Sequence, residues 1–222
     1  MATTTHESDD LVISLCAELG IKYFRGSEHD VLDRYYYAAK SLGLNGNSLN
    51  GNDTVVRITG DCPLIDAKIC DAVISLLKHS DADYVSNTIV CTFPDGLDCE
   101  AMKFEALEKS WKEAKLKYER EHVTQYILKH EDLFVLKNFP CNRDLSSMRW
   151  TLDNPEDYIF IKAVVEGMGE SKRGEDAEWV GKDDFDMNDI LCFLENNPEL
   201  IEINSSITRN EGLKKSIQEE NL

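Results

Sequence analysis

Apolar residues recur along the chain in two alternating patterns, one with helical spacing and one made of short β-branched runs. The helical spacing predicts helices over residues 9–19, 31–42, 66–79, 104–114, 120–129, 155–168 and 188–194. The short runs predict strands over residues 54–59, 83–86, 97–103, 133–138 and 148–152, and residues 21–24 form a further short apolar run. Strands separated by helices in this way are typical of an α/β sandwich over a mostly parallel sheet.

Capping residues mark the starts of several predicted helices. Ser27 or Asp30 fits the cap of the helix over 31–42, and Asp66 fits the cap of the helix that ends near His79. Pro155 sits well in the first turn of the helix over 155–168. These local signals place the boundaries of three helices before any tertiary contact is considered.

Two stretches lack either pattern. Residues 44–52 repeat Asn-Gly and predict a surface loop, and residues 170–186 are charged and weakly periodic. The last twenty residues have too little apolar content to form a core of their own. We therefore predict a domain over residues 1–169, followed over residues 170–222 by a charged linker and a helical C-terminal extension.

Composition and charge narrow the class of protein. The 222 residues include 24 Lys and Arg and 42 Asp and Glu, which give a net charge of −18. Such a surface disfavours nucleic acid and anionic membranes as partners, but a local pocket for a small phosphorylated ligand is compatible with it. The first ten residues lack the basic start and apolar run of a secretory signal, and no stretch reaches the roughly 20 apolar residues of a membrane-spanning helix. The seven Cys include no CxxC pair, which favours a reducing cytoplasm over a disulfide framework.

The first candidate for chemistry is the segment RITGDCPLID, residues 57–66. A predicted buried strand ends there and delivers Asp61 at the strand end, where ligands bind in open α/β sheets. Asp61 could hold a hard divalent cation such as Mg²⁺ through oxygen, or it could make a turn before Pro63. Asp66 is better explained as a helix cap than as a ligand.

A second candidate is MRWTLDNPED, residues 148–157. Another predicted strand delivers Asp153 just before a helix, and one metal ion commonly needs carboxylates from two strand ends. Asp-Asn-Pro-Glu is also a strong helix-start pattern, so Asp153 could be an N-cap instead. Glu156 and Asp157 are more simply explained as partners of the helix dipole.

The third and fourth candidates are a histidine and a set of acids. His122 could donate to an anionic substrate or move a proton, although a packed helical histidine is the commoner case. Asp98 and Glu100 alternate on a predicted strand and so share a face that could line a sugar site, whereas Asp95 with Gly96 fits a simple turn. The sequence lacks the motifs GxGxxG, GxxxxGK[ST] and GxSxG, which removes the usual support for dinucleotide binding, Walker-type NTP hydrolysis and nucleophile-elbow hydrolases.

Several motifs, in order along residues 2–168, resemble those of the cytidylyltransferase family. They are FRGSEHDVLDRYYYAAK, VVRITGDCPLID, ADYVSN, FPDGLDCE, EREHVT and MRWTLDNPEDYIFIK. The branch that they resemble most is that of spore-coat polysaccharide biosynthesis protein F, and synthetases of CMP-activated sugar acids are more distant. The resemblance implies a three-layer α/β/α nucleotidyltransferase fold in which a sugar hydroxyl attacks the α-phosphorus of CTP and pyrophosphate leaves.

The resemblance also implies roles for individual residues. According to this resemblance, Asp61 and Asp153 hold the metal ion, and Arg34, Arg57 and Asp61 lie near the nucleotide. His122 lies near the sugar and, with Arg149, takes part in catalysis. The remaining residues that it places near the sugar are Asp95, Asp98, Glu100 and Glu121.

The resemblance further implies that the chain lacks the family's opening strand and the loop after it, which is similar to A-R-x-G-S-x-R-L-P-x-K. We therefore expect a domain that is incomplete at its N-terminus, with a sheet edge that favours association into a homodimer. Activation of a sugar or sugar acid in glycan precursor synthesis is the leading hypothesis. A non-catalytic relative that keeps the fold for binding or assembly is a second. A metal-dependent glycosyltransferase is a third, against which the GDCP context of Asp61 counts.

Overall fold

A four-stranded sheet forms the centre of the protein in this computed structural model, which describes residues 1–46, 53–171 and 185–220. Its strands, in spatial order, are β3 (Thr54–Arg57), β5 (Glu100–Lys103), β4 (Tyr84–Ser86) and β6 (Leu136–Asn138). β5 runs antiparallel to both of its neighbours, and β4 and β6 are parallel, so β3, β4 and β6 share one direction. The predicted mostly parallel sheet is confirmed, with β5 as its reversed strand.

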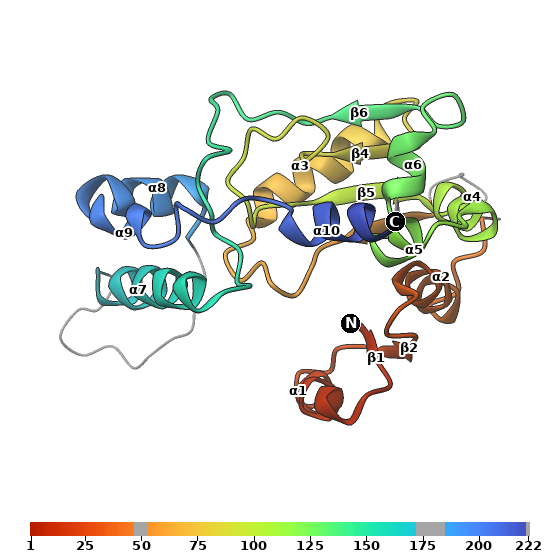
Figure 1. Ribbon diagram of the computed structural model, residues 1–222, viewed down its shortest axis with the longest axis horizontal. Coiled ribbons are helices and arrows are strands. Elements are labelled where there is room, and N and C mark those ends of the chain that lie inside the picture. Colours follow the sequence, from red (N-terminus) through yellow and green to blue (C-terminus); the bar gives the residue numbers. More distant parts are fainter. Residues whose placement is uncertain (47–52, 172–184, 221–222) are drawn as a thin grey trace.

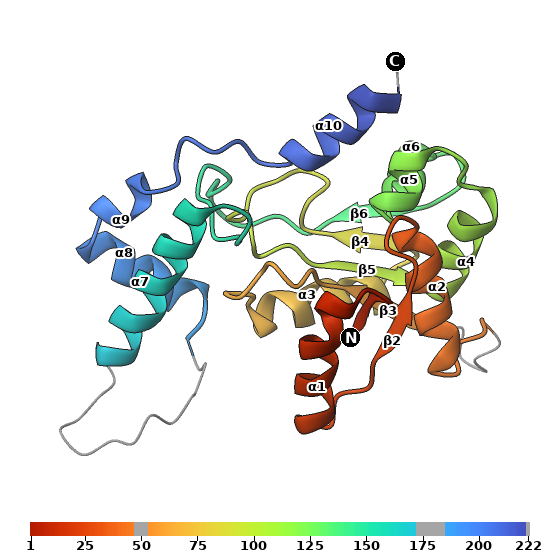
Figure 2. The ribbon, with the colours of Figure 1, turned by 60° about the horizontal axis from the view of Figure 1, so that its bottom comes forward.

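Successive residues of the strands enter cores on opposite faces of this sheet. Tyr84 and Met102 belong to one cluster, which packs under α2 (Val31–Ser41), α4 (Phe104–Glu113) and α6 (Gln125–Lys129). Val85 and Ala101 belong to another, which packs under α3 (Ala67–Lys78). The alternation follows from the two-residue period of a strand, and it gives the three-layer α/β/α arrangement that Figure 2 shows.

Asp66 is confirmed as the cap of α3, and of the two alternatives for α2 the cap is Asp30 rather than Ser27. The Asp66 carboxylate accepts the N–H groups of Lys68 (2.7 Å) and Ile69 (3.3 Å) at the start of α3. Asp30 accepts the N–H of Asp33 (2.9 Å) at the start of α2, and the Ser27 hydroxyl accepts the N–H of Asp30 (2.9 Å). Both signals lie within a few residues of the group that they cap, which is why the sequence alone locates them.

Two predicted elements are wrong. The single helix over 120–129 is two short helices, α5 (Lys117–Glu121) and α6, because buried Val123 between them adopts a φ of 58°. The strand over 148–152 does not form a ladder, since Arg149 makes one isolated parallel bridge with Asp95. The strands predicted over 54–59, 97–103 and 133–138 are shorter than expected, and the run 21–24 contributes only Phe24 to β2 (Phe24–Gly26).

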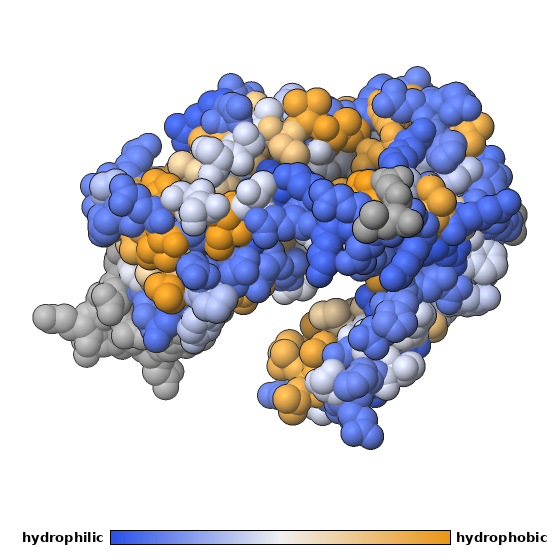
Figure 3. All heavy atoms as spheres, viewed as in Figure 1, coloured by the Kyte–Doolittle hydropathy of each residue, from blue (hydrophilic) through white to orange (hydrophobic). Residues whose placement is uncertain are grey.

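The N-terminal part forms a small unit beside the sheet. β1 (Ala2–Thr4) pairs in parallel with β2, and a short 3₁₀ helix, η1 (Glu7–Asp9), leads into α1 (Asp10–Glu18), close to the helix predicted over 9–19. Leu11, Leu15 and Leu19 of this unit are exposed. Figure 3 shows apolar side chains gathered on it, at the bottom of the view.

The C-terminal helices pack at the far end of the sheet (Figure 1). They are α7 (Pro155–Ser171), α8 (Met187–Asn196) and α9 (Glu199–Glu202), and the first two share a core cluster that includes Phe160, Val164 and Ile190. α10 (Glu211–Glu220) lies beside α5 instead. The predicted loop over 44–52 and the predicted linker over 170–186 fall largely on residues outside the described ranges. No helix in the described ranges has both the length and the apolar character needed to cross a membrane.

Candidate active site

A cavity of about 460 Å³ opens where three loops meet at one end of the central strands. The loop after β3 brings Asp61, the loop before β5 brings Asp95 and Asp98, and the loop before α7 brings Asp153. Because β5 runs in the opposite direction, its first residue lies at the same end of the sheet as the last residue of β3. These two residues, Glu100 and Arg57, are paired in the β3–β5 register. The topology therefore gathers acids that are far apart in the sequence.

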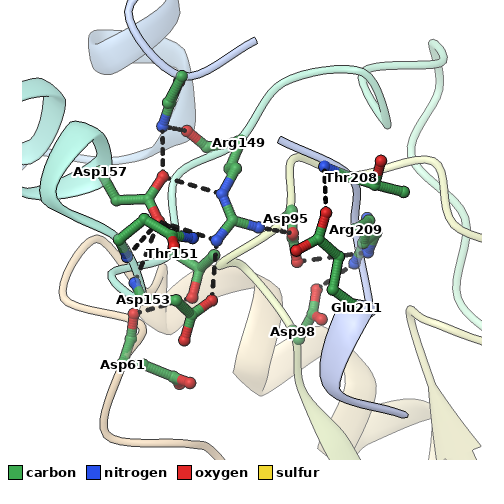
Figure 4. Close-up of polar contacts among 12 residues, drawn as sticks. Asp61, Asp95, Asp98, Arg149, Thr151, Asp153, Asp157, Thr208, Arg209 and Glu211 are labelled. Atoms are coloured by element: carbon green, nitrogen blue, oxygen red, sulfur yellow. Dashed lines mark hydrogen bonds and ion pairs between the residues drawn. The ribbon is translucent and has the colours of Figure 1, made fainter. Parts of the chain in front are cut away.

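Arg149 lies at the centre of one wall of this cavity (Figure 4). It donates to Asp157 through Nε and one terminal nitrogen, both at 2.8 Å, to Asp153 at 2.9 Å and to Asp95 at 3.1 Å. The Arg149 side chain is 7% exposed and that of Asp157 is fully buried. We conclude that Arg149 fixes three carboxylates in place, because its donors are directed at them.

Asp157 joins this network to the backbone. Its carboxylate accepts the N–H groups of Asp153 (3.1 Å) and Asn154 (2.9 Å) and the side-chain amide of Asn204 (2.9 Å). Burial alone would raise the pKa of Asp157, but the hydrogen bonds from Arg149, Asn204 and the backbone hold that pKa well below its usual range. Asp157 therefore binds the backbone N–H groups just before α7. The alternative that Asp153 is the N-cap is not supported, because the carboxylate of Asp153 accepts a hydrogen bond from Arg149.

Glu100 is a buried acid of the set, as is Asp95. It forms an ion pair with Arg57 and accepts hydrogen bonds from the hydroxyls of Tyr84 (2.5 Å) and Thr124 (2.7 Å). Each of these partners comes from a different element, so Glu100 is held in one orientation at the floor of the cavity.

Asp98 and Asp95 face a guanidinium from the C-terminal segment. Arg209 donates to Asp98 (2.5 Å) and to the carbonyl of Phe93 (3.1 Å), and its Nε lies 3.4 Å from Asp95. Burial raises the pKa of Asp98 to about 6, although Arg209 opposes the shift. Burial likewise raises the pKa of Asp95, against the effect of Arg209 and Arg149.

His122 lies in the same cavity, just before the positive-φ residue Val123. Its Nε2 is 3.1 Å from the hydroxyl of Ser216, which donates to Glu121 at 3.2 Å. Burial lowers the pKa of His122 from its usual value, while Glu121 opposes this effect and Arg57 adds to it. The imidazole is therefore neutral at pH 7 and able to accept a proton.

Asp61 and Asp153 present oxygen ligands from two different loops on one cavity. The carbonyl of Asp61 accepts the N–H of Leu152 (2.8 Å) and the hydroxyl of Thr151 (3.1 Å), so the two loops are held side by side. Within the described residues, no group of three or more His, Cys, Asp or Glu is arranged to hold a metal ion. Two carboxylates completed by phosphate oxygens are nevertheless a common donor set for Mg²⁺, so the residues present fit that ion.

Arg34 and Glu121 line a second cavity, of about 640 Å³, between α2, β2 and the open edge of β3. Arg34 donates to the carbonyl of Ser27 (2.7 Å). Arg57 and Thr59 line both cavities, so the end of β3 and the loop after it separate the two. The structure thus brings together Arg57, Asp61, Asp95, Asp98, Glu100, His122, Arg149 and Asp153, and it places Arg34 and Glu121 next to them rather than among them.

Four residues that build the site were not predicted from the sequence. They are Thr151, Asn204, Arg209 and Asp157, the last of which was not predicted to be the ion-pair partner of Arg149. Asn204 and Arg209 lie in the segment after α9, and both reach back to residues 47 or more positions earlier. The sequence signal for Arg209 is only that it is a cation in a segment with too little apolar content to form a core.

The fold and the site agree with comparisons to known proteins. A family model described as cytidylyltransferase matches residues 1–175. The chain belongs to the cytidylyltransferase family. Membership in this family makes it a nucleotidyltransferase that uses CTP.

Individual relatives match most of the chain. An uncharacterised protein of Methanocaldococcus jannaschii is 36% identical over 209 residues, which are 93% of this chain and 76% of that protein. The spore coat polysaccharide biosynthesis protein SpsF of Bacillus subtilis is 28% identical over 210 residues, which are 90% of this chain and 75% of SpsF. The solved structure of a cytidylyltransferase from Leptospira borgpetersenii superposes with a TM-score of 0.76 at 31% identity, over 89% of this chain and 76% of that one.

Proposed function

We propose that this cytidylyltransferase joins CMP to a sugar or sugar acid, with release of pyrophosphate, and so supplies activated precursors for polysaccharide or glycan synthesis. The observation that carries the proposal is that Asp61 and Asp153 line one cavity whose lining includes further carboxylates, from Asp95, Asp98, Glu100 and Glu211, that can accept hydrogen bonds from hydroxyl groups. A cavity that combines a candidate metal site with further carboxylate acceptors suits a triphosphate and a polyol together.

The proposed reaction is an in-line displacement at the α-phosphorus of CTP. A sugar hydroxyl oxygen forms a bond to that phosphorus, and the bond from the phosphorus to the bridging oxygen of the β-phosphate breaks. The hydroxyl proton passes to a base, and pyrophosphate leaves with the bonding electron pair. Positioning and charge stabilisation supply most of the rate in such transfers.

The residues would divide this work by position. Asp61 and Asp153 would hold Mg²⁺, which when bound neutralises charge on the triphosphate. Arg57 lines both cavities and pairs with Glu100, so its guanidinium would place a positive charge beside the triphosphate. The neutral imidazole of His122 accepts the proton of the attacking hydroxyl.

Arg149 has a different part in this scheme. Its donors are engaged by Asp95, Asp153 and Asp157, so we assign it to holding the acids rather than to contact with substrate. A homodimer and a cytoplasmic location, both expected from the sequence, stay predictions.

A thermal-shift titration with CTP, UTP, ATP and GTP, each with and without Mg²⁺, tests the nucleotide part of the proposal. At 100 times its dissociation constant a ligand adds about 2.7 kcal/mol of stability. We expect selective stabilisation by CTP that requires Mg²⁺. An equal response to all four nucleotides, or none from a cooperatively folding protein, would favour the hypothesis of a non-catalytic relative.

Matched variants test the assignment of the metal ligands. Asp61→Asn removes one negative ligand, and it should abolish the Mg²⁺-dependent part of the CTP shift and reduce pyrophosphate release by about 100-fold or more. Asp132→Asn, an exposed acid outside both cavities, is the control and should leave both unchanged. Unchanged Mg²⁺ dependence in Asp61→Asn would show that the ion is held elsewhere.

A further inference from the structure

A hydroxyl group from the C-terminal helix contacts the imidazole of His122. The Nε2 atom of His122 lies 3.1 Å from the hydroxyl oxygen of Ser216, which belongs to α10. Both side chains are half-buried, so water competes for this contact less than it would on an open surface. The contact therefore connects α10 to the group that takes the proton in the proposed reaction.

The hydroxyl of Ser216 has one proton and three polar neighbours. Besides Nε2 of His122, its oxygen lies 3.2 Å from a carboxylate oxygen of Glu121 and 3.1 Å from the carbonyl oxygen of Gly212. A carboxylate and a carbonyl can only accept, whereas each nitrogen of a neutral imidazole either donates or accepts. The arrangement that forms the most hydrogen bonds therefore has the proton of His122 on Nε2, where the N–H donates to Ser216.

The other ring nitrogen is then the one that can take a proton. A neutral imidazole carries a single N–H, so a proton on Nε2 leaves the lone pair of Nδ1 free. Among the described residues, no group forms a hydrogen bond with Nδ1 of His122. The side chain lines the cavity that also contains Asp61 and Asp153, so a substrate in that cavity has this residue beside it.

Contacts on both sides of Ser216 fix its place. Glu220, the last residue of α10, accepts the first two N–H groups of α5 at 2.9 and 3.0 Å, and these groups have no partner within their own helix. On the other side, Arg209 donates to Asp98 two residues before α10 begins. The hydroxyl of Ser216 is thus held against His122 by the fold and not by a single contact.

We propose that Ser216 is a positioning residue for His122: it accepts the N–H at Nε2 and so keeps Nδ1 unprotonated for the attacking hydroxyl. The proton of that hydroxyl passes to Nδ1, and its bonding electrons stay on the oxygen that attacks phosphorus. The ring becomes a cation whose second N–H remains on Ser216. Burial disfavours this cation, and Glu121 opposes that effect by raising the pKa of His122. The inference rests on the proposed function and adds a residue of the C-terminal extension to it.

Nitrogen-15 NMR of the imidazole rings tests the tautomer without any substrate. Spectra at pH 8, where His122 is neutral, report which ring nitrogen carries the proton, and the His122 signals are identified by their absence in His122→Gln. We expect about nine tenths or more of His122 to carry the proton on Nε2, and Ser216→Ala to raise the fraction with the proton on Nδ1 about threefold. A majority with the proton on Nδ1 in the unaltered protein would overturn the inference, because Ser216 would then be the donor.

Rates of pyrophosphate release test the positioning role. The assay contains Mg²⁺, CTP and whichever acceptor is active in a screen of neutral hexoses, amino sugars and sugar acids. Ser216→Ala should lower kcat about tenfold with little change in the KM for CTP, and Ser216→Thr, which keeps the hydroxyl, should restore most of the rate. Ser205→Ala makes the same substitution at an exposed serine outside both cavities and should leave kcat unchanged.

The outcomes separate the inference from the proposed function. An unchanged kcat in Ser216→Ala, an equal loss in Ser205→Ala, or a loss that Ser216→Thr does not restore would each overturn the positioning role while the reaction itself stands. Failure of the unaltered protein to release pyrophosphate with any acceptor would overturn the proposed function instead, and the NMR measurement would still decide the tautomer.

Discussion

Arg149 and Asp157 form a two-point ion pair beneath the cavity, with Nε to Oδ1 and a terminal nitrogen to Oδ2 both at 2.8 Å. Two parallel bonds fix the angle between the planes of the two groups as well as their distance. The remaining donors of Arg149 then point at Asp95 and Asp153, so the geometry of the acids on the cavity follows from this one pair.

Breaking this pair should destabilise the protein strongly. Asp157→Asn leaves Arg149 with less compensation in a buried place, and we expect a loss of about 3–5 kcal/mol in the free energy of unfolding. Urea unfolding followed by circular dichroism measures it. Glu166→Gln, which alters the exposed pair between Lys162 and Glu166, is the control and should cost less than about 0.5 kcal/mol. Equal effects of the two substitutions would show that the buried pair has no special weight.

The Asp66 carboxylate ties two helices together. It caps α3, and its second oxygen accepts the N–H of Met187 at the start of α8 (2.9 Å). Asp66→Ala should cost about 1–2 kcal/mol and speed hydrogen exchange at the Met187 amide. Asp71→Ala, on the exposed face of α3, should change neither measurement appreciably. Normal exchange at Met187 in Asp66→Ala would contradict the proposed tie.

Gly96 occupies a place that no other residue fits. Its φ is 107°, and an added Cβ would lie 2.5 Å from the Trp150 carbonyl carbon and 2.6 Å from the Thr151 nitrogen. Because both contacts are with backbone, Gly96→Ala should destabilise the protein by more than about 1 kcal/mol and separate Asp95 from Arg149. Gly60→Ala, where a Cβ meets nothing within 4 Å, is the matched control for thermal stability. A small effect at both positions would show that the loop before β5 yields easily.

Asp98 should make the stability depend on pH. Its pKa is raised by burial from 3.8 to about 6 in the folded protein, so between these values the folded chain holds a proton that the unfolded chain has lost. The contribution of Asp98 to stability is therefore full below the lower value and is lost as the pH rises through about 6.

Arg209 opposes this shift, so its removal should raise the pKa of Asp98 further. Carbon-detected NMR of the Asp98 carboxyl, in the unaltered protein and in Arg209→Gln, measures the change directly. Lys115→Gln, an exposed substitution outside both cavities, should leave the titration where it is. A carboxyl of Asp98 that titrates near 3.8 in the unaltered protein would contradict the burial described here.

Sequence patterns predicted those structural features that depend on residues close to one another along the chain. The cap at Asp66 and the buried run of β3 are of this kind, because each signal lies within a few residues of its effect. The break at Val123 could not be predicted, since a β-branched residue adopts a positive φ only when surrounding contacts impose it.

The candidate site was predicted only in part, because some of its residues carry a local sequence signal and others do not. Acids that follow or precede strands are visible in the sequence, and the sheet order brings Asp61, Asp98 and Asp153 to one cavity. Arg209 and Asn204 act across 111 and 47 positions with no periodic signal, so only the folded chain shows their partners.

The C-terminal residues that line the cavity, 207, 208 and 210–213, also determine when the cavity is completed during synthesis of the chain. Arg209 meets a partner that leaves the ribosome 111 residues earlier, and the anchor of Ser216 to His122 spans 94 residues. A nascent chain that has emerged only through α7 contains Asp61, Asp98 and Asp153 but lacks residues 207–213 of the lining. The cavity is therefore completed by a segment that is synthesised well after the acids it encloses.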